Sequence, residues 1–346
     1  MGERTMMDYE PMRTMFYRKC VELEPWDDHE YLDLFRFQST YNPVYRSYCD
    51  YLNVNVDNVS RLEDIPFLPV SVFKNHIVKT GNWMEERVFR SSGTTGQSPS
   101  CHFVRDLKFY HRCAVNSFSC FYGNPGEYVW FGLLPSYLER ADSSLVEMVR
   151  YFMSLGAQKN GFYLDQMEQL TNDLIKTGAS SQKIVVIGVS FALLDWAESK
   201  PLGLPDQMIL METGGMKGRK AELTREALHE KLKTSFGLDR IHSEYGMTEM
   251  MHQCYARENG HFLCPTPVKI LRRELHDPLT VHRTPGPGVL NLIDPGNVDT
   301  CAFIAVEDLV QIRSDGKFEL LGRTDDSELR GCNLMYTGTE NQFSEQ

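Results

Sequence analysis

Ten residues of this sequence, 91–100, are rich in hydroxyl groups and glycine. The stretch reads SSGTTGQSPS and follows a short strand-like run at 87–90. Gly93 and Gly96 can adopt positive φ, which lets backbone N–H groups converge on one point, and the hydroxyls add donors with little bulk. Such a loop suits the oxygens of a nucleoside triphosphate. It is neither a GxxxxGK[ST] loop nor a GxGxxG loop, so a flexible polar turn is an equal alternative on this stretch alone.

Two later motifs change that balance. YGMTE at 245–249 and GRTDD at 322–326 follow the loop in this order. Together the three motifs resemble the adenylate-forming superfamily, which contains acyl-CoA synthetases, peptide-synthetase adenylation domains and luciferases. The resemblance spans residues 89–331. It implies that the protein uses ATP and Mg²⁺ to convert a carboxylic acid into an acyl adenylate.

The resemblance also assigns roles to individual residues. The loop would cradle the β- and γ-phosphates, Thr248 would meet the α-phosphate, and Glu249 would bind Mg²⁺ as a metal ligand. Asp308 and Arg323 would hold the ribose, and Tyr245 would stack on adenine. The implied nucleotide-binding residues are Ser91, Ser92, Gly93, Thr94, Thr95, Gly96, Gly214, Gly215, Tyr245, Gly246, Asp308 and Arg323. The plainer alternatives are a solvated acid at 249, a core aromatic at 245, a hairpin-edge acid at 308 and an ordinary strand-to-turn junction at 212–216.

The phosphate loop departs from the superfamily at its end. The loop usually closes with Pro-Lys, whereas this chain has Pro99-Ser100. The chain therefore lacks one positive charge at this point. Four residues could supply it instead: His102, Arg105, Lys217 and Arg219. For His102 the alternative is a histidine on a surface loop.

Cys332 lies a few residues beyond the last motif. Only 20 residues follow Asp326, so we expect the mobile C-terminal domain of the superfamily to be absent, which puts standard CoA ligation in doubt. The pattern resembles the acyl-protein synthetases of bacterial bioluminescence, which carry a fatty acid as a thioester on a cysteine near the C-terminus. Cys332 would then be catalytic, with Arg330 lowering the pKa of its thiol. The alternative is a small buried hydrophobic residue.

Three functions follow from these observations. The first is activation of a carboxylic acid, in particular a fatty acid, followed by transfer to Cys332 and delivery to an acyl-accepting reductase. The second is adenylation followed by transfer to CoA or a carrier protein. The third is an inactive nucleotide-binding scaffold, which the retained metal acid and ribose residues disfavour.

The composition indicates which kinds of binding partner are disfavoured and in which cell compartment the protein is expected. The chain has 346 residues and a net charge of −11, which argues against nucleic acid or an anionic membrane as the main partner. No apolar run approaches the length of about 18 residues needed for a membrane span, and no signal peptide is evident. The nine cysteines form no CxxC pair, so free thiols and a cytoplasmic location are expected.

Hydrophobic patterning predicts the elements that position these residues. Residues 1–86 are expected to form an N-terminal helical part, 87–261 an α/β adenylating core, and 262–346 a β-rich subdomain with a short tail. Alternating strands and helices in the middle part predict a layered α/β fold with a largely parallel sheet. Its functional loops should follow the strands at 88–90, 208–212 and 240–244. Apolar segments at 132–138 and 188–194 could line a hydrophobic acyl channel or belong to the core.

Overall fold

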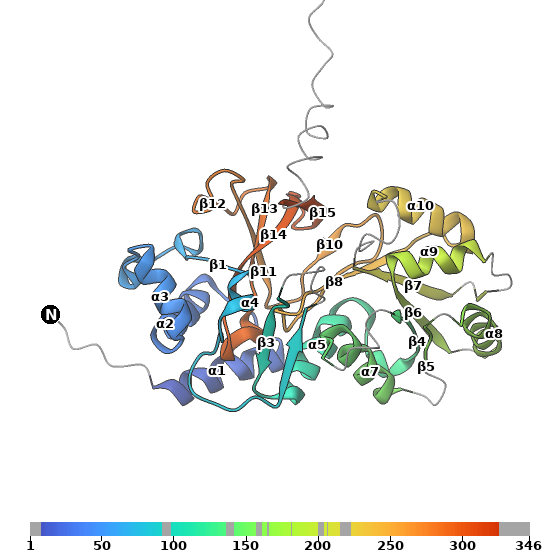
Figure 1. Cartoon of the computed structure of the whole chain (residues 1–346), viewed down its shortest axis with the longest axis horizontal. Helices are drawn as coiled ribbons and strands as arrows, with labels where there is room; N and C mark the ends of the chain where they lie inside the picture. Colours follow the sequence, from blue (N-terminus) through green and yellow to red (C-terminus); the bar gives the residue numbers. More distant parts are fainter. Residues whose placement is uncertain are drawn as a thin grey trace, which may run out of the picture.

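The computed structural model describes residues 8–91, 98–135, 142–156, 161–164, 166–180, 182–199, 204–205, 207–214 and 223–324. These residues form an elongated molecule with an N-terminal group of helices at one end and a second group of helices at the other (Figure 1). A large sheet lies between the two groups. Within the described residues, no helix is both long and apolar enough to cross a lipid bilayer.

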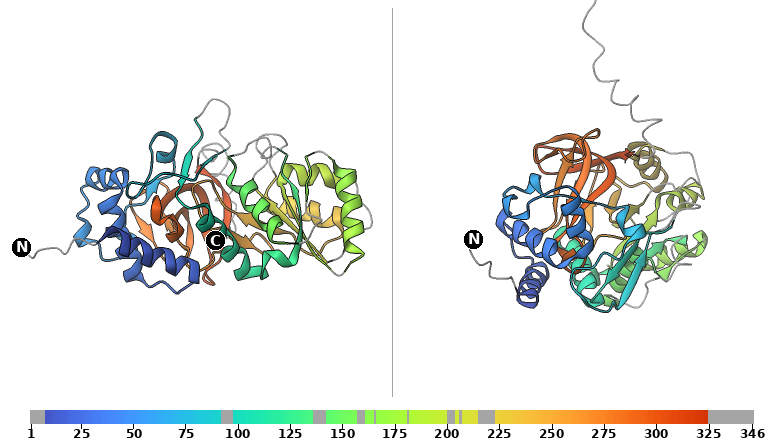
Figure 2. Two further views of the ribbon diagram at one scale, coloured as in Figure 1. Left: turned by 90° about the horizontal axis from the view of Figure 1, so that it is seen from below. Right: turned by 60° about the vertical axis from the view of Figure 1, so that its left-hand side comes forward.

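The N-terminal helices form as the sequence predicts. They are α1 (Tyr9–Glu22), α2 (Asp28–Tyr41) and α3 (Pro43–Tyr51). Helix α2 begins with a capping box in which the Asp27 side chain accepts from the Glu30 N–H and the Glu30 carboxylate accepts from the Asp27 N–H, which satisfies two otherwise unpaired donors. The three helices lie beside two strands of the sheet, β13 (Gly286–Ile293) and β14 (Phe303–Ile312) (Figure 2). The helices between residues 167 and 236 lie on the opposite side of the molecule.

Thirteen strands of the described chain join in one sheet. Its order is β12-β11-β13-β14-β15-β10-β9-β8-β7-β6-β4-β5, with β1 added beside β14. The strands β4 (Tyr128–Leu133), β5 (Gly161–Phe162), β6 (Lys183–Val189), β7 (Met208–Thr213) and β8 (His242–Tyr245) run parallel. From β9 onward the neighbours on the main path are antiparallel. The parallel part is as expected, and the whole sheet is mixed.

The antiparallel part contains β9 (Cys254–Ala256), β10 (Phe262–Leu263), β11 (Lys269–Arg273), β12 (Val281–His282), β13 (Gly286–Ile293), β14 (Phe303–Ile312) and β15 (Phe318–Arg323). Strand β1 (Leu68–Pro69) runs parallel to β14. Strand β14 runs without a break from Phe303 to Ile312, because alternate residues along its whole length face a common core.

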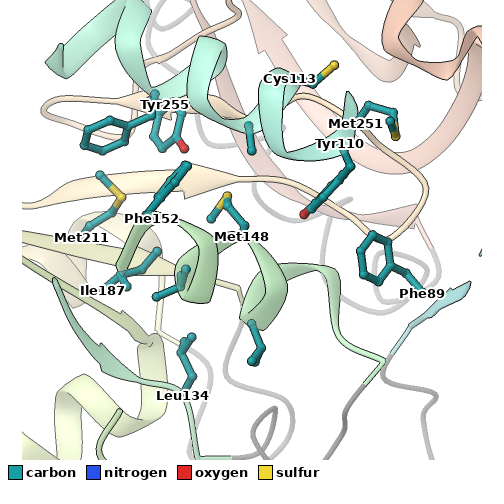
Figure 3. Packing of buried hydrophobic residues seen from close by; sticks show 14 of the residues in the cluster. Phe89, Tyr110, Cys113, Leu134, Met148, Phe152, Ile187, Met211, Met251 and Tyr255 are labelled. Carbon is teal, nitrogen blue, oxygen red and sulfur yellow. The ribbon is translucent and has the colours of Figure 1, made fainter. Parts of the chain in front are cut away.

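Helices cover both faces of the parallel strands. Helix α5 (Leu107–Tyr122) and α7 (Ser144–Leu155) pack on one face, while α8 (Met167–Gly178), α9 (Ser190–Glu198) and α10 (Arg225–Phe236) lie on the other. Figure 3 shows the first interface, where Tyr110 of α5 extends toward α7, which carries Met148 and Phe152. A second hydrophobic cluster, around Tyr245, lies in the antiparallel part. The short helices are α4 (Val72–Asn75), η1 (Val56–Asn58), η2 (Leu62–Asp64), η3 (Pro125–Glu127) and η4 (Pro295–Asp299).

The phosphate loop has a different setting from the one expected. It connects β2 (Arg87–Arg90) and β3 (Cys101–Val104), which form a separate two-stranded antiparallel ribbon. The expectation that the loop follows a strand of the parallel sheet is therefore wrong. The reason is that β3, which the sequence pattern did not predict, pairs with β2 along its full length and returns the chain as a hairpin.

Candidate functional site

The segments that follow β7 and β8 lie next to each other. Thr213 at the end of β7 is in register with Glu244 near the end of β8, and the Thr213 hydroxyl donates to the Glu244 carboxylate. Gly214 then adopts a positive φ of 71°, which favours glycine. Its carbonyl accepts a hydrogen bond of 2.6 Å from the Ser190 hydroxyl. Gly215 lies outside the described residues.

Two of the three proposed adenosine-binding residues are in direct contact. The Tyr245 hydroxyl donates to the Asp308 carboxylate over 2.7 Å, and the Tyr245 ring packs edge-on against Phe262 and Phe318. Arg323 lies opposite Asp308 in the β14–β15 ladder. Its guanidinium donates to Glu307 over 2.7 Å. Asp308 and Arg323 are therefore paired across the two strands, but their side chains contact different residues, Tyr245 and Glu307.

Glu249 is a buried acid, with 5% of its surface exposed. Burial raises the pKa of its carboxyl group, and a hydrogen bond from the Ser100 hydroxyl opposes that shift. The backbone around it is fixed as well: the Asn297 amide donates to the Glu249 carbonyl over 2.8 Å. One residue earlier, the Thr248 carbonyl lies 2.8 Å from His102 Nδ1. Gly246, between Tyr245 and this turn, is exposed.

The two ends of the phosphate loop are held together. The Ser91 N–H donates to the Ser100 carbonyl over 3.1 Å, and the Ser100 N–H donates to the Ser91 hydroxyl over 2.9 Å. The loop is thus anchored within hydrogen-bond reach of Glu249, since Ser100 contacts both Ser91 and that carboxylate. The other predicted loop residues, Ser92, Gly93, Thr94, Thr95 and Gly96, lie outside the described residues.

Two buried carboxylates at this edge of the sheet have opposite electrostatic settings. Glu212 points toward α10; burial alone would raise its pKa, but Arg225, His229 and Ser243 lower it to about 2. Arg225 Nε lies 3.0 Å from the carboxylate. Glu244 points to the other face, where burial and the charge of Glu212 raise its pKa to about 7 despite the Thr213 hydrogen bond. Neither acid was singled out by the sequence motifs.

The structure removes two of the candidate replacements for the missing lysine. His102 is 1% exposed, and both ring nitrogens contact protein groups, Thr248 and Thr300, so it does not face a ligand as one alternative held. Arg105 pairs with Asp299 and Glu10. Lys217 and Arg219 lie outside the described residues, as do Arg330 and the predicted acyl acceptor Cys332.

Sequence reasoning missed the residues that support the metal-acid turn, 248–252. The Asp294 carboxylate accepts from the N–H groups of Met251 and His252 and pairs with His252 Nδ1 over 2.6 Å, with both side chains fully buried. The sequence DPGN at 294–297 is a turn signal that marks the segment. The local pattern does not show that this segment is buried against a turn more than 40 residues earlier in the sequence.

The donor set suits a metal held partly by a nucleotide. Within the described residues, no group of three His, Cys, Asp or Glu side chains is placed to hold a metal ion. Glu249 is a lone carboxylate, and Mg²⁺ is commonly bound by one or two carboxylates together with phosphate oxygens and water. The buried Glu249 fits that role, because a bound cation would offset the cost of a carboxylate removed from water.

The fold is that of the adenylate-forming acyl-CoA ligases. A structure of 2-hydroxyisobutyryl-CoA ligase with 2-HIB-AMP and CoA superposes with a TM-score of 0.63 and 14% identity, covering 86% of this chain and 70% of that one. A postadenylation structure of the same enzyme covers 94% of this chain and 73% of its own, with a TM-score of 0.63 and 12% identity. ATP-bound MatB from Rhodopseudomonas palustris covers 69% of this chain and 48% of its own, with a TM-score of 0.50 and 17% identity.

Sequence similarity then points to one branch of these enzymes. A long-chain-fatty-acid–luciferin-component ligase from Photorhabdus luminescens is 44% identical over 66 residues. That match spans 19% of this chain and 56% of the relative, so it covers little more than half of the curated protein. No known family profile matches the chain. The comparisons confirm the resemblance drawn from the motifs, to the adenylate-forming superfamily and to a bioluminescence-type ligase.

Proposed function

We propose that this protein is an ATP-dependent ligase that activates a carboxylic acid, and specifically a fatty acid, as an acyl adenylate. The observation that carries this proposal is the contact between the strand that follows the phosphate loop and the turn at 248–252, in which His102 Nδ1 lies 2.8 Å from the Thr248 carbonyl. It brings two motifs about 150 residues apart into one site, within a fold shared with adenylate-forming ligases. The fatty acid is supported by the name of the curated relative.

The reaction is a displacement at phosphorus. A carboxylate oxygen of the substrate forms a bond to the α-phosphorus of ATP, and the bond to the pyrophosphate oxygen breaks, so acyl-AMP and pyrophosphate are the products. Mg²⁺, when bound, would offset negative charge on the phosphate oxygens. Glu249 would hold that ion, and the loop at 91–96 would supply donors to the β- and γ-phosphates.

The described residues prepare this site in advance. Contacts from His102 and Asn297 fix the backbone of Thr248 and Glu249. The Thr248 hydroxyl is therefore held in a defined position, from which it would donate to an α-phosphate oxygen. The Tyr245 hydroxyl fixes the Asp308 carboxylate, the group that would hold the ribose hydroxyls. Gly214, exposed and at positive φ, lets the backbone after β7 approach the base.

The acyl acceptor is the finer part of the proposal. The Cys332 thiolate would attack the carbonyl carbon of the acyl adenylate, forming a thioester and releasing AMP. The acyl group would then pass to an acyl-accepting reductase. The structural similarity to CoA ligases supports a second candidate, in which CoA or a carrier protein takes the acyl group directly.

ATP–pyrophosphate exchange tests the activation step. Purified protein, Mg²⁺ and a panel of fatty and aromatic acids should give exchange that depends on the fatty acids. No exchange with any acid, from a protein that binds ATP, would contradict an adenylating function in the isolated chain and favour a nucleotide-binding scaffold.

Intact mass spectrometry separates the two acceptors. After incubation with ATP, Mg²⁺ and the acid, the wild type should gain the mass of one acyl group, and Cys332→Ala should not. An equal adduct on both proteins would exclude Cys332 as the acceptor. Exchange without any adduct, with acyl transfer only when CoA or a carrier protein is added, would establish the second candidate.

A further inference from the structure

Strand β3 follows the phosphate loop in the sequence and contacts the metal-acid turn, 248–252, in space. Ser100, just before the strand, and His102, within it, are two residues apart and therefore lie on the same side of the extended chain. Both are buried, with exposures of 2% and 1%. Ser100 contacts the Glu249 side chain, and His102 contacts the Thr248 backbone. One short segment thus reaches both residues that would act on the α-phosphate and the metal.

The contacts of His102 define its tautomer. The Thr248 carbonyl can only accept, so the 2.8 Å contact requires a proton on Nδ1. Burial lowers the pKa of His102 to about 4, which keeps the ring neutral near pH 7. Nε2 is then an acceptor and lies 3.2 Å from the Thr300 hydroxyl, which donates to the Asn297 side-chain oxygen at the same distance. The Nδ1 proton thus holds the Thr248 carbonyl in place.

Ser100 orients the Glu249 side chain without neutralising its negative charge. Its hydroxyl donates to the Glu249 carboxylate, while its N–H and carbonyl close the neck of the loop on Ser91. A lysine at this position would place a positive charge beside Glu249 and compete with a metal ion for it. A neutral hydroxyl directs the carboxylate and keeps its full negative charge for a cation.

Other contacts hold only the backbone of this turn. Asn297 donates to the Glu249 carbonyl, and Asp294 accepts from the N–H groups of Met251 and His252. Removing the Ser100 hydroxyl should therefore leave the turn in place and free the Glu249 side chain alone. This separation allows a positioning effect to be measured apart from loss of folding.

Resting on the proposed function, we propose that Ser100 and His102 are positioning residues that aim Glu249 and Thr248 at a metal-bound nucleotide. Ser100 acts on the metal through Glu249, and His102 acts on the α-phosphate through Thr248. The serine that replaces the usual lysine of the loop thus has its own role, to orient the metal acid.

The test of Ser100 compares Ser100→Ala with Ser39→Ala. Ser39 is a matched control because it is a buried serine as well. Its hydroxyl donates to the Phe35 carbonyl within α2, outside the candidate site. Calorimetry would give the affinity for ATP with Mg²⁺ and with EDTA. We expect Ser100→Ala to lower the Mg²⁺-dependent gain in ATP affinity about 10-fold, an effect equivalent to one charged hydrogen bond, and to leave binding in EDTA unchanged. Ser39→Ala should match the wild type in both.

The test of His102 uses two variants. His102→Asn keeps an N–H donor near the position of Nδ1, whereas His102→Leu removes it. We expect His102→Leu to lower kcat for exchange about 100-fold, because small displacements of catalytic groups have effects of this size, with a smaller change in the KM for ATP. His102→Asn should recover at least a tenth of the wild-type rate.

The possible outcomes separate this inference from the proposed function. A wild type without exchange contradicts the proposed function, while the calorimetric comparison still tests Ser100. A wild type with exchange, together with a Ser100→Ala protein whose Mg²⁺-dependent affinity equals that of Ser39→Ala, overturns the role of Ser100. Equal loss of kcat in the two His102 variants at an unchanged melting temperature overturns the role of His102.

Discussion

The turn at 248–252 and the hairpin of β14 and β15 would both meet the nucleotide, but the protein holds them in different ways. The turn is buried and is fixed by polar contacts from distant segments, through His102, Asn297 and Asp294. The hairpin carries Asp308 and Arg323 on a regular ladder, and the Arg323 side chain is 51% exposed. Under the proposed function, the acid that would hold the metal is buried, while the arginine that would bind the sugar remains in contact with water.

The largest effect should come from Asp294→Ala. This change leaves the buried His252 without its 2.6 Å partner and two backbone N–H groups of the turn without an acceptor. We expect the free energy of unfolding to fall by about 3–5 kcal/mol, measured by urea denaturation. Asp315→Ala, on the exposed turn before β15, is the control and should leave the free energy of unfolding close to that of the wild type. Similar effects of the two changes would contradict the contrast between the regions.

Glu249→Gln should abolish most of the activity while keeping the fold. The amide retains the shape and loses the charge that would hold the metal, so we expect ATP–pyrophosphate exchange to fall about 100-fold or more. The exposed Glu258, a few residues later, provides the control variant Glu258→Gln. Comparable exchange rates in the two variants would show that position 249 is not the metal acid.

Glu244, in β8 just before the turn at 248–252, should make the stability of the protein depend on pH. Because burial raises its pKa from 4.5 to about 7, the folded protein binds this proton more tightly than the unfolded chain. The resulting stabilisation is complete below pH 4.5 and is lost as pH rises through 7. Between pH 5 and pH 8 the wild type should lose about 2.5 kcal/mol of unfolding free energy relative to Glu244→Gln. Parallel stability curves for the two proteins would contradict a raised pKa at this position.

Tyr245→Phe tests the link between the two regions. The change removes the 2.7 Å hydrogen bond to Asp308, which is equivalent to about 1 kcal/mol. We therefore expect the KM for ATP to rise about 5-fold with kcat little changed. Tyr128→Phe, which also removes a hydroxyl bonded within the protein, should leave both constants unaltered. A fall in kcat without a change in KM would place Tyr245 with the catalytic turn.

The smallest effect should come from Glu307→Gln on the hairpin. Its pair with Arg323 is partly exposed, and such surface pairs contribute at most about 1 kcal/mol. We expect the free energy of unfolding to change by less than about 0.5 kcal/mol and the KM for ATP by less than about 2-fold. A large loss of ATP binding would mean that Glu307 holds Arg323 for the ribose.

Local sequence patterns predicted the alternation of helices and parallel strands, except for the two-residue strand β5, because capping and periodicity are short-range signals. Asp106, Ser143 and Thr224 cap α5, α7 and α10, and Gly237 ends α10 in the left-handed conformation. Strands β3 and β9 were missed, since each is only three or four residues long and depends on a partner strand for its extended form.

The site was predicted as motifs and not as contacts. The motifs placed Glu249 and Tyr245 at the ends of strands, but they did not identify the residues that hold them. Ser100 and His102 were read only in relation to a missing lysine, although their spacing of two residues on a short strand is what brings them to the same turn. Contacts of this kind join segments about 150 residues apart, and local patterns contain no information about them.

The continuity of the sheet has a practical consequence for dissecting this chain. Strand β10 is hydrogen-bonded to β9 on one side and to β15 on the other, so no loop separates the parallel strands from the antiparallel ones. A recombinant fragment ending before β10 would present the unpaired edge of β9 (Cys254–Ala256) to other chains. We expect such fragments to form aggregates rather than independent folding units, so complementary pieces of this protein would have to be produced together.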